Sequence, residues 1–486
     1  MEPTISREPS PVTHLTSTAS EGRTSWPASV YAVPTALRER LNAQFDGEVI
    51  LPGDEQYEEL RHVHNRAYDR HPALIVRAKS AQDVAKAVRF ALWEDKRIAV
   101  RSGRHSIAAY STGDDAVVID LGAMDRVEID PVRKTARVQP GVTSGKLAPL
   151  AQEHGLALST GDSATVGLGG LATGGGIGFM VRTLGLTIDS LISAEVVTAD
   201  GGIVRASKER HPDLFWAIRG GGGNFGIITE FEFQLSDVGI VYGGLLVLPA
   251  TPQVIKAYAD YALHAPESLT TIAMVMRAPE APFIPAERVG EMVLGINIVN
   301  VGDVEAGERV VAPLRALAEP VADLVSPIPY SAIYDFVPEF PDSPLSVRAV
   351  YGPEITEEFV AGAVALLEKA PGEIAAFQIR PLGGKMARVP QDATAFVHRD
   401  KNFLFAAITM TMGASTAEGI TAWADEFFAL MRPMGTGVYV NFLQEEGEER
   451  IVEAYGRETY QRLRQVKRDW DPDNVFRLNQ NIKPAR

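Results

Sequence analysis

Residues 101–120, RSGRHSIAAYSTGDDAVVID, form the stretch around which we expect the fold to be organised. An apolar run at 98–100 leads into a turn of small residues at 101–106, and a second strand-like run follows at 117–121. A turn of this kind can present several backbone N–H groups to one anion. It also contains His105, and an imidazole can act as a nucleophile, a base or a ligand near neutral pH.

The composition limits the kinds of partner and site. With 486 residues, the chain is long for one hydrophobic core and fits two domains. A net charge of −15 argues against nucleic acid or an anionic membrane as the main partner. The sequence contains no cysteine, which excludes disulfides, zinc–thiolate sites, iron–sulfur clusters and catalytic thiolates.

The sequence shows no targeting or membrane segment. No run approaches roughly 18 consecutive apolar residues, and the N-terminus has neither a basic start nor an apolar core. We therefore expect residues 1–30 to form a disordered Ser/Thr/Pro tail. We expect the protein to be cytoplasmic, a monomer or homodimer, and without a membrane or nucleic-acid partner.

Hydrophobic patterns predict mixed helices and hairpins in the first half of the chain. Residues 81–96 have the clearest helical period, with Ser80 and Asp83 as a cap. Four strand-like runs are expected to pair as two hairpins, 126–130 with 135–139 and 193–198 with 203–205. Short helices are also expected at 35–45, 57–68 and 143–154. This arrangement favours an α+β unit over a repeated βαβ array.

From about residue 240 the pattern changes to longer strands separated by helices. Strands are expected at 243–248, 271–276, 292–298, 375–379 and 403–410, and helices at 251–263, 303–318, 355–369 and 415–431. This pattern predicts a second domain with a large antiparallel sheet covered by helices on one side. The polar C-terminus is expected to return to the first domain. The predicted boundaries are 1–30 for the tail, 31–240, 241–435, and 436–486 for the C-terminal segment.

Two glycine clusters accompany the turn at 101–106. They are GDSATVGLGGLATGGGIG at 161–178 and RGGGGNFG at 219–226. Residues 221–226 match G-x-G-x-x-G, but a helix-like segment precedes them and a strand-like segment follows, whereas a Rossmann turn needs a strand and then a helix. The match at 167–172 fails too, because more glycine follows instead of a helix. The three loops therefore predict an extended polar ligand, of which a dinucleotide is the obvious candidate.

Three histidines lie near the helix predicted at 57–68. A metal cluster is conceivable, because Glu58 precedes His62 by one helical turn. His64 points to another face, however, and His71 lies beyond the helix. We interpret them as ordinary helix and loop histidines, and predict no metal site.

The three loops and the C-terminus together resemble the vanillyl-alcohol oxidase and p-cresol methylhydroxylase superfamily, in its berberine bridge enzyme branch. The likeness covers nearly everything from about residue 45 to 484. The motifs that carry it are RSGRHS at 101–106, GDSATVGLGGLATGGGIG at 161–178, DLFWAIRGGGGNFGIIT at 213–229, YVNF at 439–442 and DPDNVFRLNQNI at 471–482. The resemblance implies a two-domain α+β fold with an FAD-binding domain and a substrate domain.

The resemblance also implies that the His105 imidazole is bonded to the 8α-methyl group of the FAD isoalloxazine. Branch members often carry a second link from a cysteine, but Ser163 stands at that position here, so we expect a single attachment. A loop histidine beside non-covalent FAD is the alternative. The expected cofactor-binding residues are Arg101, Ser102, Gly103, Arg104, His105, Ser106, Gly161, Thr165, Val166, Gly169, Gly170, Gly174, Gly175, Gly178, Gly226, Ile228 and Asn479.

For catalysis, Tyr439 matches a phenol that the branch often uses as a base, and Asn441 is its expected polar neighbour near the flavin ring. A phenol, whose ordinary pKa is about 10, needs a positive or hydrogen-bonding group beside it to act at neutral pH. The alternative for Tyr439 is a strand tyrosine packed on the sheet.

The chain departs from the branch around the substrate. Ile177 stands where many relatives have a second active-site tyrosine, and Leu171 where some have histidine. Plant members place a glutamate or glutamine within the segment that here reads FLFAA, residues 403–407. We therefore expect an apolar pocket, poor in acid and base groups, which favours an aromatic, alkaloid-like or polyketide-like substrate over an oligosaccharide. His398 and Arg399 either border the pocket or, as we favour, form a solvated charged turn.

The function predicted by the resemblance is that of an FAD-dependent oxidase. It would transfer a hydride from a C–H bond of a small, largely apolar alcohol or amine to flavin N5, and then pass electrons to O2, giving H2O2. Val166 lies where the family places its oxygen gatekeeper, and valine there is typical of an oxidase. The alternatives are a dehydrogenase or biosynthetic tailoring enzyme, a carbohydrate oxidase, and a flavin-binding protein without turnover.

Overall fold

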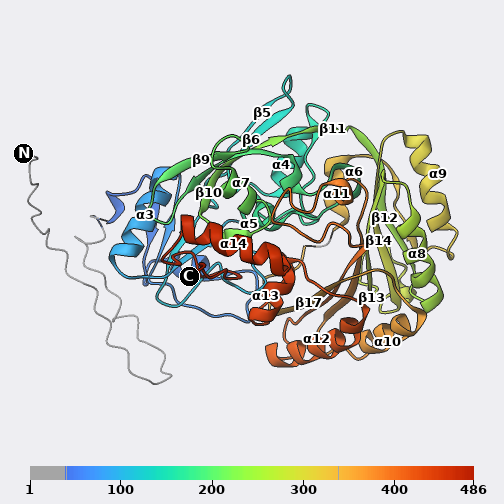
Figure 1. Ribbon diagram of the computed structural model, residues 1–486. Coiled ribbons are helices and arrows are strands. Elements are labelled where there is room, and N and C mark those ends of the chain that lie inside the picture. Colours follow the sequence, from blue (N-terminus) through green and yellow to red (C-terminus); the bar gives the residue numbers. More distant parts are fainter. Residues whose placement is uncertain (1–38, 40, 338) are drawn as a thin grey trace, which may run out of the picture.

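The computed structural model describes residue 39, residues 41–337 and residues 339–486 (Figure 1). The tail predicted at 1–30 and part of the helix predicted at 35–45 lie outside the described residues. Figure 1 shows the small sheets of the first half of the chain at one end and the large sheet, with its helices, at the other. Among the described residues, no helix combines the length and the apolar character needed to cross a membrane.

The first sheet contains the strands that frame residues 101–120. Its order is β1 (Glu48–Ile50), β2 (Leu74–Arg77), β4 (Val117–Asp120) and β3 (Ile98–Arg101). Strands β2 and β3 both run parallel to β4, and α3 (Ala81–Trp93), capped by Ser80 as predicted, makes the crossover between them. Arg101, at the end of β3, pairs in register with Asp120 and binds its carboxylate at 2.7 Å, with both side chains buried. The turn that follows is therefore fixed at the sheet edge.

The second sheet is antiparallel and confirms both predicted hairpins. Its order is β5 (Val127–Asp130), β6 (Thr135–Val138), β10 (Ile227–Gln234), β8 (Leu191–Val197) and β9 (Ile203–Ser207). A two-stranded sheet joins β7 (Leu156–Ala157) and β11 (Ser236–Asp237). The helices of this half are α2 (Tyr57–Arg61), α4 (Ser144–Gln152), α5 (Leu168–Gly174), α6 (Val181–Leu184) and α7 (Pro212–Ala217), with 3-10 turns at η2 (Thr187–Ser190) and η3 (Gly222–Asn224).

Helix α5 corrects the sequence analysis, which expected no helix after Gly167. Residues 168–174 are helical despite their glycines, because Leu168 and Ala172 are buried in the hydrophobic core of the second sheet. Tertiary packing here outweighs the low helix propensity of glycine. Helix α2 is shorter than the predicted 57–68 and ends at Arg61, which leaves His64 in an irregular segment.

The large sheet is antiparallel, as predicted. Its order is β15 (Ala322–Asp323), β12 (Ile240–Pro249), β14 (Met292–Val301), β13 (Leu269–Arg277), β18 (Ile374–Pro381), β19 (Phe403–Met410) and β17 (Leu345–Gly352), and β16 (Ser326–Pro329) also pairs with β12. The sequence analysis missed β17. Figure 1 shows the covering helices α8 (Pro252–His264), α9 (Val304–Arg315), α10 (Glu357–Leu367) and α12 (Ala417–Met431) on the outer side of this sheet. Shorter elements nearby are α11 (Lys385–Arg388), η4 (Ala286–Arg288), η5 (Tyr330–Phe336) and η6 (Arg432–Met434).

Side chains alternate between the two faces of the large sheet. Phe377 and Ile379 of β18 pack into the core beneath the helices, as do Phe403, Phe405 and Ala407 of β19. Because successive residues of a strand point to opposite faces, the even-numbered residues of both strands face the other way, toward the first half of the chain.

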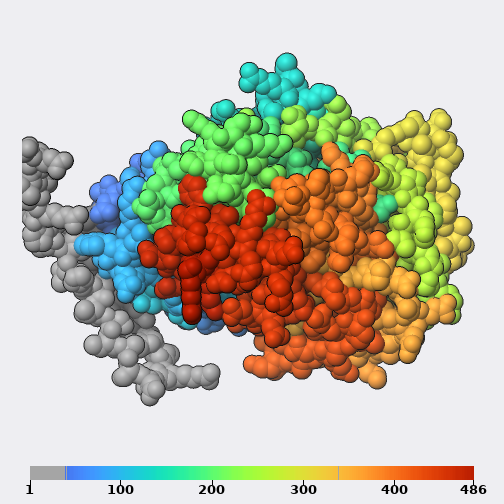
Figure 2. All heavy atoms as spheres, viewed as in Figure 1, coloured from blue at the N-terminus to red at the C-terminus, as the bar shows by residue number. Residues whose placement is uncertain are grey.

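The C-terminal segment packs against the first half of the chain. After η7 (Val440–Phe442), helices α13 (Glu448–Tyr455) and α14 (Arg457–Trp470) follow. Tyr455, Leu463 and Val466 are buried in the same core as Phe215 and Phe225. In Figure 2 this segment, in red, lies between the green and orange surfaces of the preceding parts of the chain.

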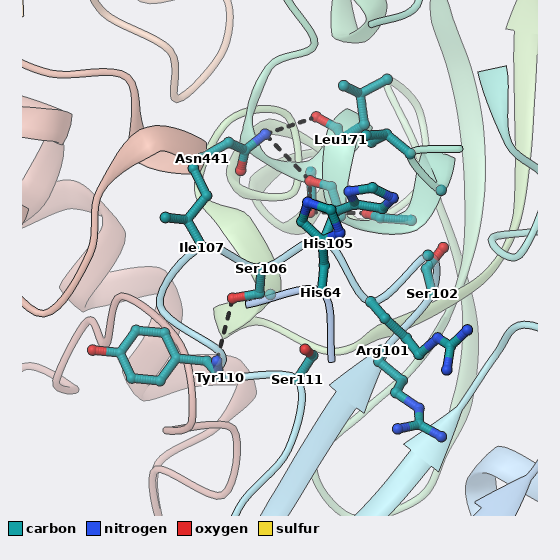
Figure 3. Close-up of a pocket in the computed structure, with 18 of the residues that line it drawn as sticks. His64, Arg101, Ser102, His105, Ser106, Ile107, Tyr110, Ser111, Leu171 and Asn441 are labelled. Atoms are coloured by element: carbon teal, nitrogen blue, oxygen red, sulfur yellow. Dashed lines mark hydrogen bonds between the residues drawn. The ribbon is translucent and has the colours of Figure 1, made fainter. Parts of the chain in front are cut away.

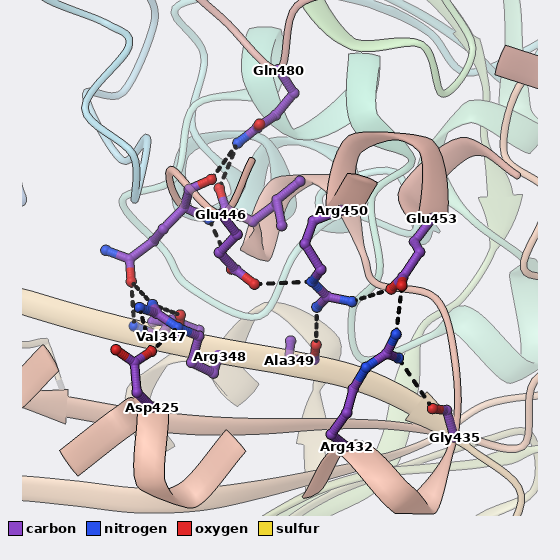
Figure 4. A network of polar contacts seen from close by, with 12 residues as sticks. Val347, Arg348, Ala349, Asp425, Arg432, Gly435, Glu446, Arg450, Glu453 and Gln480 are labelled. Atoms are coloured by element: carbon purple, nitrogen blue, oxygen red, sulfur yellow. Dashed lines mark hydrogen bonds and ion pairs between the residues drawn. The ribbon is translucent and has the colours of Figure 1, made fainter. Parts of the chain in front are cut away.

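A polar network ties the C-terminal segment to the edge strand β17 (Figure 4). Arg450 of α13 donates a hydrogen bond to the Ala349 carbonyl at 2.8 Å and forms an ion pair with Glu446 at 3.0 Å. The Gln444 side-chain oxygen accepts hydrogen bonds from the Val347 N–H and from Arg348. The otherwise unpaired edge of β17 is therefore held by residues far away in the sequence.

Lys467 and Asp471 form a fully buried ion pair at the end of α14. The distance between Lys467 Nζ and Asp471 Oδ2 is 2.6 Å, and both side chains are 0% exposed. The ammonium also donates to the carbonyls of Asn224 and Phe476, and the carboxylate accepts from the N–H of Phe476. One charge pair thus connects the loop before β10, helix α14 and the C-terminal tail.

We expect Lys467→Met to lower the free energy of unfolding by about 3–5 kcal/mol, because it leaves the Asp471 charge buried and unpaired. Urea unfolding followed by circular dichroism measures this difference. Lys483→Met is the matched control. Lys483 Nζ lies 3.2 Å from Glu448 Oε2, and both side chains are exposed. The loss of unfolding free energy should therefore stay within about 1 kcal/mol. Equal losses of unfolding free energy in the two variants would show that the buried Lys467–Asp471 pair does not stabilise the fold more than an exposed ion pair does.

Candidate functional site

A cavity of about 900 Å³ lies between the first half of the chain and the large sheet. One wall consists of backbone-rich loops around residues 101–106, 162–171 and 222–228. The opposite wall consists of side chains from β13, β17, β18 and β19, and the C-terminal segment contributes residues 439–443 and 478–480. The structure thus brings the three predicted loops to one place, facing the inner side of the sheet.

Most of the predicted site residues line this cavity. They are Arg101, Ser102, Gly103, Arg104, His105, Ser106, Thr165, Val166, Gly169, Gly170, Gly226, Ile228, Tyr439, Asn441 and Asn479. Ser163, Leu171 and Ile177, which were discussed as departures from the family pattern, line it as well.

Four predicted glycines do not line the cavity: Gly161, Gly174, Gly175 and Gly178. Their neighbours give another reason for glycine. A Cβ on Gly174 would overlap the Asn441 side chain, and one on Gly178 would overlap the Thr160 carbonyl. Gly175 has φ +137°, a conformation that side chains disfavour. These glycines allow close packing behind the cavity wall.

The turn after β3 is built to hold an anion. The backbone N–H groups of residues 103–107 donate no hydrogen bond within the described part of the chain. Arg104 has φ +64°, so the turn includes a left-handed residue, as in the backbone concavities that bind phosphates. These N–H groups border the cavity, where a ligand can satisfy them.

Two glycines let this turn touch the second loop. A Cβ on Gly103 would lie 2.5 Å from the Gly167 amide nitrogen, and a Cβ on Gly167 would lie 2.5 Å from the Gly103 nitrogen. Neither backbone can move away freely, because the Ser102 hydroxyl donates to the Pro140 carbonyl and the Leu168 N–H donates to the Val142 carbonyl. The contact fixes the position of the turn relative to α5.

His105 lies beside a second imidazole (Figure 3). The ring centroids of His64 and His105 are 4.7 Å apart, and the His64 Nδ1 is 3.0 Å from Asp342, which in turn accepts from Arg66 at 2.9 Å. Burial, and then the neighbouring His64, lower the pKa of His105 to about 4. The ring is therefore neutral at physiological pH, the form that can act as a nucleophile.

The sequence analysis missed His64, which it interpreted as an ordinary helix residue. The segment that contains His64 is instead irregular and lies against the loop before β17. There the Ser343 N–H donates a hydrogen bond to the His64 carbonyl. This long-range contact left no signal in the local sequence. In the part of the chain that the structure describes, no three His, Asp or Glu side chains gather as ligands for a metal ion.

Tyr439 is buried at the cavity wall with its hydroxyl oxygen held by two donors. The Gly176 N–H and the Asn441 side-chain amide each donate to it at 2.9 Å. Burial raises the pKa of Tyr439, while these two hydrogen bonds and the nearby Arg380 oppose that rise. The site thus supplies the hydrogen-bonding groups that a phenol base requires.

The sheet wall differs from the expected one. None of residues 403–407 lines the cavity. Phe403, Phe405 and Ala407 face the helices. Leu404 and Ala406 face the other way but are buried in a core cluster with Tyr439. Strand β19 contributes Ile408 and Met410 instead. Strand β18 adds Gln378 and Arg380, which the sequence analysis did not identify. The wall is therefore apolar with one polar cluster, rather than uniformly poor in acid and base groups.

His398 and Arg399 border neither the cavity nor solvent, so the interpretation as a solvated turn was wrong. They are 8% and 1% exposed. Arg399 forms an ion pair with buried Asp189 at 2.7 Å, and the His398 Nε2 lies 2.9 Å from the Ala454 carbonyl. The Arg399 ion pair and the His398 hydrogen bond serve the packing around η2 and α13.

We expect Gly167→Ala to lower the melting temperature by several degrees, because the new methyl group would overlap the backbone of Gly103. Gly170→Ala is the matched control, since a Cβ there meets no atom within 4 Å, and alanine favours a helix over glycine. Differential scanning calorimetry measures both. A Gly167→Ala protein as stable as the Gly170→Ala protein would show that the two loops do not depend on this contact.

Two family models match the chain. One, described as an FAD binding domain, matches residues 72–207, and the other, described as berberine and berberine like, matches residues 438–483. The first contains the turn at 101–106 and the glycine run at 161–178. The second contains Tyr439, Asn441 and Asn479.

Similar proteins extend over nearly the whole chain. The chain is 31% identical over 459 residues to (R)-6-hydroxynicotine oxidase of Paenarthrobacter nicotinovorans, covering 90% of this chain and 97% of that protein. It is 29% identical over 485 residues to chitooligosaccharide oxidase of Gibberella zeae, covering 94% and 97%.

Solved structures show the same fold. The crystal structure of 6-hydroxy-D-nicotine oxidase from Arthrobacter nicotinovorans matches with a TM-score of 0.81 and 30% identity, covering 91% of this chain and 98% of that one. Glucooligosaccharide oxidase from Acremonium strictum, described with a 6-S-cysteinyl, 8α-N1-histidyl FAD, matches with a TM-score of 0.78 and 25% identity, covering 93% and 99%. The chain therefore belongs to the berberine bridge enzyme-like family of FAD-dependent oxidoreductases.

Proposed function

We propose that this protein is an oxidase that holds FAD through one covalent bond to His105, removes a hydride from a C–H bond of a small alcohol or amine, and reduces O2 to H2O2. The observation that carries the proposal is the turn after β3. It places a neutral, largely buried imidazole among five consecutive backbone N–H groups that have no protein partner in the described chain.

The residues of the cavity fit FAD. The N–H groups of residues 103–107 would hold the pyrophosphate, and the close approach of the Gly103 and Gly167 backbones holds this turn against the glycine loop. The Asn479 side-chain oxygen is buried, has no hydrogen-bond partner among the residues that the structure describes, and belongs to a residue of the same cavity lining. Ser163 lines the cavity but carries no thiol, which supports a single attachment. When bound, FAD supplies the two-electron acceptor for the hydride.

Tyr439 is the proposed base. It would take the proton from the O–H or N–H group of the substrate while the C–H bond next to that group is broken. Asn441 and the Gly176 N–H hold the phenol oxygen in place and stabilise the negative charge that it carries once its own proton has left. Arg380 lies close enough to favour the same charge.

The sheet wall supports a ring-shaped, largely apolar substrate. Met274, Val347, Ile408 and Met410 face the cavity from neighbouring strands. Named relatives oxidise 6-hydroxynicotine and oligosaccharides, and this wall fits the first kind of molecule better, because sugars need many hydrogen-bonding partners. Val166 at the cavity supports the reaction with O2. Slow reoxidation by air in stopped-flow experiments would favour a dehydrogenase, and no flavin bleaching by any substrate would favour a binding protein.

We expect wild-type protein to remain yellow after acid precipitation and His105→Ala to release its flavin into the supernatant. His71→Ala is the control, because this exposed histidine lies outside the cavity and should leave attachment unchanged. Flavin fluorescence of the pellet, measured after a denaturing gel, checks the result. A yellow supernatant from wild-type protein would disprove the covalent bond but not the fold.

The lowered pKa of His105 predicts the pH dependence of attachment. In the proposed attachment the neutral imidazole would bond to the flavin, and the pKa of His105 is about 4 instead of 6.5. Covalent incorporation of added FAD into protein produced without flavin should therefore stay constant as the pH falls to about 5, and decline only below that. A decline already centred near pH 6.5 would show that His105 is not shielded as described.

We expect Tyr439→Phe to lower turnover by about 10²- to 10⁴-fold while covalent flavin is retained. Because the pKa of Tyr439 is raised, wild-type turnover should increase with pH across the alkaline range, and the variant should lose that dependence. Tyr110→Phe is the control, since this tyrosine lines the cavity but makes no hydrogen bond with Asn441. A peroxide-coupled assay over a panel of alcohols and amines measures the rates, and an unchanged pH profile would exclude Tyr439 as the base.

A further inference from the structure

A polar cluster interrupts the apolar sheet wall of the cavity. Arg380 Nη2 donates to Asp162 at 2.6 Å, and Arg380 Nε donates to the Gln378 side-chain oxygen at 2.7 Å. Gln378 is 2% and Arg380 is 4% exposed, and all three residues line the cavity. Polar groups so deeply buried are costly unless they find partners.

The cluster retains unused donors. The hydrogen bonds above use Nε and Nη2 of Arg380 and the oxygen of Gln378. Within the described residues, the Gln378 amide nitrogen and Arg380 Nη1 have no hydrogen-bond partner. Both side chains come from β18, two residues apart on the face that points to the cavity. Two N–H donors therefore lie near each other on one wall.

The surroundings define what such donors can bind. Met274 lies directly opposite Gln378 in the sheet register, and the Arg380 guanidinium lies 5.0 Å from the Phe442 ring centroid. An apolar ring system therefore fits beside the donors. The Arg380 guanidinium is already paired with Asp162, so an anionic substrate group would have to compete with that carboxylate. A cation would have to approach the guanidinium.

We propose that Gln378 and Arg380 recognise a neutral carbonyl oxygen on a ring-shaped substrate, such as a ketone, lactone or amide. This inference rests on the proposed function, because it assigns the substrate class of the same cavity. The two donors would fix the far end of the substrate while Tyr439, on the neighbouring wall, meets the group to be oxidised. A substrate without the carbonyl leaves both donors buried and unpaired, which lowers its affinity.

Binding, rather than turnover, tests the proposal. Isothermal titration calorimetry of the flavin-loaded protein compares 1-indanone with 1-methyleneindane, which has the same shape but carries CH2 in place of the carbonyl oxygen. We expect 1-indanone to bind about tenfold more tightly. Gln378→Leu and Arg380→Met should each reduce this ratio, whereas the control Met274→Leu, which changes the apolar wall alone, should keep it. Because no turnover is needed, failure of the oxidase proposal and failure of this one are separate results.

Three outcomes would overturn the proposal. The first is equal affinity of the wild-type protein for the two compounds, including no measurable binding of 1-indanone. The second is a ratio unchanged by Gln378→Leu, which would mean that the cluster only ties the sheet to the loop at Asp162. That variant keeps the Arg380–Asp162 ion pair and so decides the matter even if Arg380→Met fails to fold. The third is tighter binding of 1-aminoindane, a cation, than of 1-indanone.

Discussion

The contact between the backbones of Gly103 and Gly167 is the constraint on which the site depends. It joins the turn that follows a parallel strand of the first sheet to the short helix α5 beside the second sheet. With a side chain at either position the two loops would have to move apart, and the turn at residues 103–107 would lose its place beside the glycine loop. At the point where the two loops meet, only backbone fits.

The opposite wall follows from strand alternation. On β18 and β19, odd-numbered residues fill the core beneath the helices, and even-numbered residues are left for the cavity side. The edge strand of this sheet is held by Arg450 and Gln444 of the C-terminal segment, whose own helices pack into the core of the second sheet. The distance between the two walls is therefore set by a segment that touches both.

Much of this could be predicted from the sequence. The hairpins, the long strands and most helices follow from local periodicity, and the three loops from their glycines. The resemblance of residues 439–442 to a family motif predicted that Tyr439 and Asn441 belong to the site, and both line the cavity. The sequence could not show that Gly174 and Gly178 serve packing. A glycine that contacts a protein group and a glycine that contacts a ligand give the same sequence pattern. Nor could the sequence place His64 and Arg380, which reach the cavity through contacts with residues more than 200 positions away.

Burial acts on the two central ionisable groups in opposite directions, but leaves both neutral. It lowers the pKa of His105 and raises the pKa of Tyr439, because in each case the charged form is penalised. Neutrality suits the proposed attachment of flavin to His105, whereas the proposed role of Tyr439 as a base requires the charged form. This difference explains the surroundings of each residue. His105 lies beside the His64 ring, while Tyr439 has two hydrogen-bond donors and a nearby guanidinium that would stabilise the negative charge of the proposed base.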